Sequence, residues 1–94
     1  MAEILKVLIV EDDAPLAEMC AKLLRRRGYS AVIAESGRAA LAVLNSDRAI
    51  DAVLSDVHMP QMSGIELLSE LRKRDAALPV ILMTGYSDLV SSAE

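Results

Sequence analysis

The feature that most constrains the fold of this chain is a set of four short apolar runs. Longer segments, in which apolar residues recur with a helical period, separate these runs. The runs are unbroken, and they cover residues 7–10, 31–34, 52–54 and 80–83. Unbroken runs of this length are typical of parallel strands that helices cover on both faces. Alternating strands and helices with right-handed crossovers predict an open parallel sheet, with the elements in the order β-α-β-α-β-α-β. A further helix is expected to begin near Tyr86.

Each segment between the runs carries signals of helix ends. Asp13 is the expected N-cap of the first helix and Gly28 its expected stop. Ser36 is expected to open the second helix, and Ser63 with Glu66 forms an S-x-x-E capping box at the start of the third. The residues expected to face the sheet are Leu16, Met19, Cys20, Leu23 and Leu24 in the first helix, Ala40, Leu41 and Leu44 in the second, and Leu67, Leu68 and Leu71 in the third.

The composition narrows the range of functions. The 94 residues are enough for one domain at most, and the 53% hydrophobic content with two Tyr and no Phe or Trp predicts an aliphatic core. A net charge of -4 argues against direct nucleic-acid binding, because phosphate contacts require a basic face. Cys20 is the single cysteine, so no internal disulfide can form. The sequence shows neither a signal peptide nor a membrane-spanning stretch, and we expect a cytoplasmic protein without membrane contact.

Acidic residues come at the ends of two predicted strands. Glu11, Asp12 and Asp13 follow the first strand, and Asp56 ends the third. In the doubly wound strand order 2-1-3-4, the carboxyl ends of these two strands meet at the topological switch point, where open α/β sheets bind ligands. Close like charges resist joint ionisation unless protons or a cation offset their repulsion. All-oxygen ligands favour a hard divalent ion, and Mg²⁺ is the natural candidate because it needs only one or two carboxylates.

A carboxylate in such a cluster can also act as a nucleophile. If Asp12 and Asp56 hold the metal, and Glu11 reaches it through water, one oxygen of Asp56 can still attack an activated phosphoryl group and form an acyl phosphate. Thr84, at the end of the fourth strand, is expected to present its hydroxyl to the same crevice. The side chain of His58 is expected to be solvated, because a lone loop histidine usually is.

Three sequence motifs together resemble one known family. They are V-L-I-V-E-D-D at residues 7–13, D-V-H-M-P-Q-M-S-G at residues 56–64 and P-V-I-L-M-T-G-Y at residues 79–86. In this order, they are similar to the receiver domain of two-component response regulators. Each motif alone is a weak match, but the set is specific and spans most of the chain. The resemblance implies a flavodoxin-like receiver over residues 1–94, which assists its own phosphorylation and dephosphorylation but transforms no metabolite and is not an enzyme.

The resemblance also implies roles for individual residues. Asp56 would take a phosphoryl group from a sensor histidine kinase, and Glu11 and Asp12 would be the acidic pair. Mg²⁺ would be bound by Asp12, Asp56 and the main-chain carbonyl of His58. Thr84 would be the hydroxyl that rearranges when the phosphoryl group arrives and so switches the surface of the domain.

The sequence departs from the family pattern in one respect. Receivers carry a fifth strand that ends in a lysine paired with the phosphoryl group, followed by a fifth helix, and the 94 residues supply neither. None of Lys6, Lys22 and Lys73 is placed to replace that lysine. We therefore expect a C-terminally incomplete receiver with a possible output domain outside this chain. If 94 residues are the whole molecule, we expect a dimer or an exchanged-segment assembly, because a sheet edge would be open.

Two other functions stay open on the sequence alone. A truncated or degenerate receiver would act as an interaction module without efficient phosphoryl switching. A phosphatase with an aspartyl nucleophile is the enzymatic alternative, but it would want a second acid two residues after Asp56, where His58 stands. An adduct on Asp56 would separate the receiver from the interaction module, and turnover of a phosphate ester would favour the phosphatase.

Overall fold

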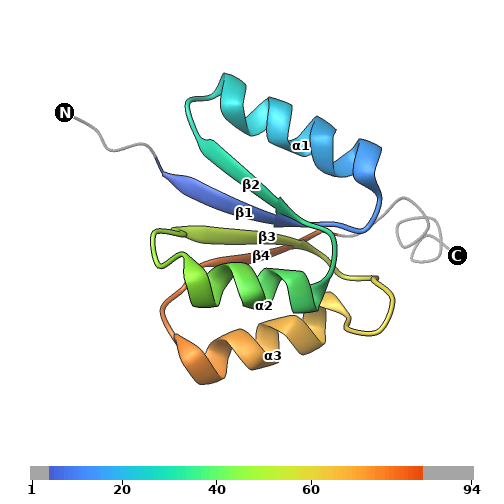
Figure 1. Ribbon diagram of the computed structural model, residues 1–94, viewed down its shortest axis with the longest axis vertical. Helices are drawn as coiled ribbons and strands as arrows, with labels where there is room; N and C mark the ends of the chain where they lie inside the picture. The colour runs from blue at the N-terminus through green and yellow to red at the C-terminus, as the bar shows by residue number, and fades with distance from the viewer. Residues whose placement is uncertain (1–4, 84–94) are drawn as a thin grey trace, which may run out of the picture.

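The computed structural model describes residues 5–83, in which four strands alternate with three helices (Figure 1). The strands are β1 (Lys6–Val10), β2 (Ser30–Ala34), β3 (Ala52–Asp56) and β4 (Val80–Met83). The helices are α1 (Ala14–Arg26), α2 (Gly37–Ser46) and α3 (Gly64–Arg74). The predicted order of elements is confirmed over this range, and the helix expected from Tyr86 lies outside the described residues. Within residues 5–83, no helix has the length and apolar character needed to cross a bilayer.

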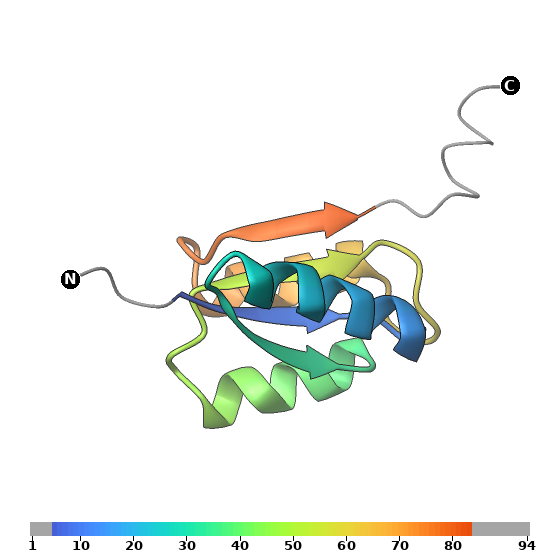
Figure 2. The same cartoon turned by 90° about the horizontal axis from the view of Figure 1, so that it is seen from above.

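The four strands form one parallel sheet in the order β2-β1-β3-β4. Val10 at the end of β1 is in register with Ala34 of β2 on one side and with Ser55 of β3 on the other. All four strands point the same way in Figure 2, so their carboxyl ends lie at one edge of the sheet. The predicted flavodoxin-like α/β fold with strand order 2-1-3-4 is confirmed.

The helices cover both faces of the sheet, with α1 on one side and α2 and α3 on the other (Figure 1). Leu8 and Val10 belong to the larger core cluster, beneath α2 and α3, whereas Ile9 packs with Ala21 of α1 in the smaller one. Leu8, Ile9 and Val10 thus face alternate layers and are all buried, which explains the unbroken apolar run. The strand β4 is less covered within the described chain, where Ile81 is 60% exposed.

The helix caps form as the sequence indicates. Asp13 at α1 and Ser36 at α2 each accept a hydrogen bond from a backbone N–H three residues further along. Ser63 and Glu66 form the reciprocal capping box at α3. Such caps satisfy N–H groups that have no partner within the helix. Gly28, with φ +92°, follows the end of α1 in the left-handed region that favours glycine.

The predicted inward face of α1 is wrong in part. Leu16, Met19 and Leu23 are 36%, 53% and 50% exposed. The residues that are buried or half-buried on this helix are Ala17, Cys20, Ala21 and Leu24. The small alanine side chains let the helix lie close to the sheet, so the longer side chains of the neighbouring stripe remain at its exposed side. The cysteine, expected to be buried, is half-buried.

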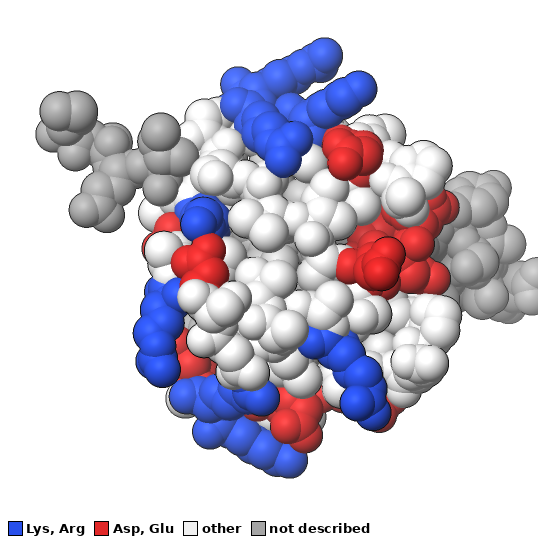
Figure 3. Space-filling view, in the orientation of Figure 1, with Lys and Arg blue, Asp and Glu red and all other residues white. Residues whose placement is uncertain are grey.

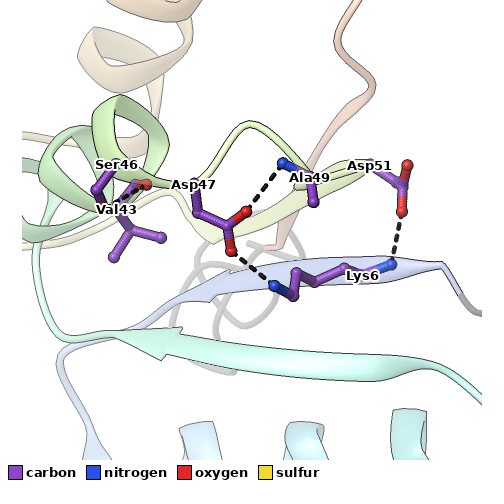
Figure 4. Close-up of polar contacts among 6 residues, drawn as sticks. All are labelled: Lys6, Val43, Ser46, Asp47, Ala49 and Asp51. Atoms are coloured by element: carbon purple, nitrogen blue, oxygen red, sulfur yellow. Dashed lines mark hydrogen bonds and ion pairs between the residues drawn. The ribbon is translucent and has the colours of Figure 1, made fainter.

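Polar contacts tie the amino end of β1 to the loop between α2 and β3 (Figure 4). Lys6 Nζ donates to Asp47 Oδ2 at 2.7 Å, and the Ala49 N–H donates to Asp47 Oδ1 at 2.9 Å. The Lys6 backbone N–H donates to Asp51 Oδ2 at 2.7 Å. The hydrogen bond from Lys6, followed by that from the Ala49 N–H, lowers the pKa of Asp47 below its ordinary value of 3.8.

We expect the Asp47→Asn variant to be less stable than the parent at neutral pH but not in acid. Because the folded pKa is lowered, ionised Asp47 stabilises the fold above its unfolded pKa, and this contribution is lost as the pH falls through the lower folded value. Urea unfolding at pH 7 and well below pH 3.8 measures the difference. Glu70→Gln removes one carboxylate from the exposed pair with Lys73 and is the control, for which we expect little change. A stability loss that is equal at both pH values would contradict this origin.

Candidate functional site

The carboxyl ends of β1 and β3 bring three carboxylates to one edge of the sheet. Glu11 and Asp12 follow β1 directly, and Asp56 is the last residue of β3. One oxygen from each of the three side chains lies within 4.8 Å of the other two. Figure 3 shows acidic side chains gathered at this end of the strands, while Lys and Arg gather elsewhere on the same face of the molecule. The strand order therefore places these residues together, as the switch-point argument predicts.

The three carboxylates differ in their surroundings. Glu11 is only 3% exposed, whereas Asp12 is exposed and Asp56 is half-buried. The backbone N–H of Glu11 donates to Ala34 O at 3.0 Å, and its Oε2 accepts from the Asp13 N–H at 3.1 Å. Glu11 is thus fixed by β2 on one side and by its own loop on the other, while the two aspartates are more accessible to solvent.

Burial is the main cause of a raised pKa at Glu11. The hydrogen bond with Asp12 and the charges of Asp56 and Asp12 raise it further, and the N–H of Asp13 partly opposes this rise. The neighbouring charge of Glu11 also adds to the effect of burial in raising the pKa of the Cys20 thiol. A carboxylate that is both desolvated and beside like charges is destabilised in its ionised form, and a cation bound among the three groups would relieve that repulsion.

The donor set fits a hard divalent cation. All three side chains offer oxygen, and two of them, Asp12 and Asp56, are accessible from solvent. Mg²⁺ keeps several waters and binds through one or two carboxylates, so it does not require a closed cage of protein ligands. A site with two accessible aspartates and one buried glutamate matches this requirement.

We expect Glu11→Gln to raise the thermal stability of the magnesium-free protein at pH 7. The raised folded pKa of Glu11 favours the folded state below the unfolded pKa near 4.5, and this contribution is lost as the pH rises through the folded value. Glutamine cannot ionise and avoids the loss, so the variant should exceed the parent at pH 7 and match it near pH 4.

Thermal unfolding in EDTA at the two pH values measures this effect. Glu18→Gln is the matched control, because Glu18 is exposed on α1 and the substitution removes the same charge. A larger rise for the control than for Glu11→Gln would refute the assignment of the effect to the buried carboxylate.

The loop after β3 passes close to the cluster. The His58 N–H donates to Asp56 Oδ1 at 3.4 Å, so the main chain of His58 lies beside that carboxylate, and the residue is exposed. The Val57 N–H donates to Met83 O at 3.0 Å, and the Gly64 N–H donates to Val57 O at 2.8 Å. These bonds fix the start of the loop to β4 and to the first residue of α3.

Thr84 lies outside the described residues, although Met83 before it is in register with Asp56. The three lysines of the sequence are all described. Lys6 pairs with Asp47 at the amino end of β1, Lys73 pairs with Glu70, and the third lysine lies within α1. Within residues 5–83, no ion pair joins a lysine to the three carboxylates.

A cavity of about 510 Å³ lies at the opposite end of the sheet from the carboxylates. The ends of α2 and α3 and the loops that lead into β3 and β4 form its walls, which consist of Leu44, Asn45, Asp47, Arg48, Ile50, Leu71, Arg74, Asp75 and Leu78. None of Glu11, Asp12 and Asp56 lines it. The cavity and the cluster of three carboxylates are therefore separate features.

The model of the response regulator receiver domain family matches residues 7–94. The chain belongs to this family. The receiver is 40% identical over 88 residues to the transcriptional regulatory protein ZraR of Escherichia coli O157:H7. It is 44% identical over 89 residues to the response regulator protein FleR of Pseudomonas aeruginosa. These matches cover 94% and 95% of the chain but only 20% and 19% of the relatives, so the chain spans about a fifth of their length.

Solved receiver structures have the same fold. A response regulator receiver protein from Pseudomonas putida superposes with a TM-score of 0.85 at 30% identity, over 99% of this chain and 78% of that one. The response regulator TrrA from Thermotoga maritima, in complex with Mg²⁺-BeF, gives a TM-score of 0.84 at 34% identity, over 94% of this chain and 76% of that one. The resemblance seen in the three motifs is confirmed.

Proposed function

We propose that this receiver accepts a phosphoryl group on Asp56 and thereby switches its surface. The convergence of Glu11, Asp12 and Asp56 at the ends of β1 and β3, with oxygens within 4.8 Å of one another, is the observation that carries the proposal. Asp56 is the nucleophile of choice because it is half-buried and beside the main chain of His58, whereas Glu11 is buried.

Asp12, Asp56 and the main-chain carbonyl of His58 would hold Mg²⁺, with Glu11 reaching it through water. When bound, Mg²⁺ supplies the positive charge that offsets repulsion between the carboxylates and the incoming phosphoryl oxygens. The all-oxygen donor set and the raised pKa of Glu11 support this assignment.

The phosphoryl donor would be a phosphohistidine of a sensor histidine kinase. One oxygen of the ionised Asp56 carboxylate attacks phosphorus, the phosphorus–nitrogen bond breaks, and its electron pair remains on the imidazole nitrogen. The product is an acyl phosphate, and attack of water on it returns the carboxylate and inorganic phosphate. The Thr84 hydroxyl would donate to a phosphoryl oxygen and shift toward it, so that phosphorylation changes the population of two packings near β4.

The partners follow from this chemistry and from the relatives. We propose a sensor histidine kinase as donor and an output domain outside these residues, because the relatives ZraR and FleR are named as regulators and are longer than this chain. The net charge of -4 supports a receiver that does not itself contact nucleic acid. We place it in the cytoplasm, and we regard it as a signalling module rather than an enzyme.

Labelling with acetyl phosphate tests the proposal without a cognate kinase. The folded protein is incubated with acetyl phosphate and Mg²⁺, and the adduct is counted by intact mass and located after borohydride reduction, which converts aspartyl phosphate to homoserine. We expect one phosphoryl group, on Asp56, that does not form in EDTA. No adduct on a folded, magnesium-binding chain would favour the interaction-module function, and turnover of a phosphate ester would favour the phosphatase.

A further inference from the structure

One side chain of the loop between β3 and α3, that of Met62, packs against Gly37, the first residue of α2. A Cβ placed on Gly37 would lie 2.6 Å from Met62 Sδ, 3.0 Å from its Cγ and 3.1 Å from its Cβ. Gly37 is buried, and Met62 is half-buried and packs against the larger core cluster. The Met62 side chain therefore occupies the space that any side chain at position 37 would need.

Met62 also closes a tight turn in the same loop. Its backbone N–H donates to Pro60 O at 2.7 Å, across Gln61 with φ +69°. Gln61 is the one non-glycine residue with positive φ in the described range, and a three-residue turn of this hand is strained. A strained turn persists only where its surroundings hold it, and here Met59 and Met62 anchor it to the core from both sides.

The turn lies between two fixed points. At its start, the loop is bonded to β4 and to Gly64 through Val57, and at its end Met62 rests on Gly37. Residues 58–61 span these two points, and His58 is among them. Because the Met62 Cβ as well as its Sδ lies close to position 37, a new side chain there would press on the Met62 main chain, and residues 58–61 would shift while the stem at Val57 stays in place.

We propose that Met62 is a positioning residue, which through its packing on Gly37 sets the direction of the His58 carbonyl toward the cation. This inference rests on the proposed function, because it concerns the same metal site. Mg²⁺ requires near-ideal octahedral geometry at short distances, so a small shift of a carbonyl lowers metal affinity more than it lowers global stability. The contact also couples the start of α2 to the metal loop, and the coupling is reciprocal.

A double-mutant cycle tests the proposal. Mg²⁺ affinity is measured by amide NMR titration for Gly37→Ala, Met62→Ala and the double variant, and urea stability is measured in EDTA. We expect each single variant to weaken Mg²⁺ binding about tenfold, a magnitude typical of groups that orient metal ligands. In the double variant the alanine at position 37 should add no further loss, because the side chain it displaces is absent. Met62→Leu, which preserves size, should retain the parent affinity within about twofold.

The controls separate positioning from simple structural support. Gly28→Ala changes a glycine with φ +92° and no neighbour within 4 Å of the new Cβ, so it should lower stability and leave Mg²⁺ affinity unchanged. In the magnesium-free protein, the His58 and Gln61 amide shifts should move in Gly37→Ala but not in Gly28→Ala. If Gly37→Ala does not fold, weaker Mg²⁺ binding by Met62→Ala than by Met62→Leu supports the positioning role. Equal Mg²⁺ affinity of these two variants overturns it.

Failure of this inference is distinct from failure of the proposed function. If the parent binds Mg²⁺ and all variants bind it equally, Met62 has no positioning role while the metal site stands. If the parent binds no Mg²⁺, the proposed function fails, and the inference fails with it. A loss of urea stability without any change in affinity overturns the positioning role as well.

Discussion

The Asp56→Asn variant should lose phosphoryl transfer and keep its fold. An amide oxygen is a much weaker nucleophile than a carboxylate, and the substitution also removes one of the three carboxylates whose oxygens converge within 4.8 Å. We expect the rate of labelling by acetyl phosphate to fall at least about a thousandfold, as loss of a nucleophile commonly does. Intact-mass measurement over a time course, with Mg²⁺ in excess, gives the rate for the parent and the variant.

The same substitution should not destabilise the magnesium-free protein. The charge of Asp56 is one of the causes that raise the pKa of Glu11, so a neutral asparagine brings that pKa closer to its ordinary value. The thermal midpoint in EDTA at pH 7 should equal or exceed that of the parent. An unfolded or strongly destabilised variant would contradict the view that repulsion dominates this cluster.

Asp13→Asn is the matched control for both measurements. It removes the same charge beside the same cluster, and asparagine is as good an N-cap as aspartate, so α1 keeps its first hydrogen bond to Leu16. The control should be labelled at close to the parental rate. Equal labelling of the parent and Asp56→Asn would falsify the assignment of Asp56 and transfer the role to another carboxylate.

The strands could be predicted from the sequence because burial on two faces leaves a plain signal. Leu8 and Ile9 pack into different core clusters, and only an unbroken apolar run satisfies both. The caps at Asp13 and Ser36 could be predicted because they depend on local backbone groups. The fold class follows from these local signals and the handedness of crossovers.

The inward face of α1 could not be predicted in the same way. Two neighbouring stripes of this helix are apolar, and the one with Ala17 and Ala21 is buried instead of the one with Leu16 and Met19. The helical spacing of apolar residues fits both stripes equally well. The choice depends on how closely the helix approaches the sheet, which is a property of the packed layers.

The candidate site could be predicted only in its outline. The meeting of Glu11 with Asp56 follows from the strand order, since both come at the carboxyl ends of adjacent strands. The burial of Glu11 does not follow, because it depends on contacts with β2. The contact of Met62 with Gly37 joins residues from separate loops and helices, and no periodic pattern marks it. The role of Thr84 stays a prediction, since it lies outside the described residues.

Gly64→Ala should be the most destabilising glycine substitution in the described chain. A Cβ on Gly64 would lie 2.3 Å from the carbonyl oxygen of Asp56 and 3.0 Å from Val57 Cα. Both atoms belong to the backbone, which cannot relieve the clash by a change of rotamer. The first turn of α3 must then move away from β3, and the 2.8 Å hydrogen bond from the Gly64 N–H to Val57 O is strained or lost.

We expect a loss of about 3 kcal/mol in unfolding free energy for Gly64→Ala, the upper part of the range for overpacked sites. For a domain of this size, that corresponds to a fall of roughly 10 °C or more in the thermal midpoint. Gly28→Ala is again the comparison, because its cost arises from positive φ alone and is about 1 kcal/mol. Urea and thermal unfolding of the two variants in EDTA give both values.

Gly64→Ala and Gly28→Ala should also differ in their effects on Mg²⁺ binding. Gly64 contacts the carbonyl of the same residue whose carboxylate is the proposed nucleophile, so its displacement should shift Asp56 and weaken Mg²⁺ binding even at temperatures where the variant is folded. Gly28 follows α1 and should leave Mg²⁺ affinity unchanged. Equal stability of Gly64→Ala and the parent, within about 0.5 kcal/mol, would show that α3 does not press against the Asp56 carbonyl. Lower stability with unaltered Mg²⁺ affinity would show that the start of α3 does not control the site.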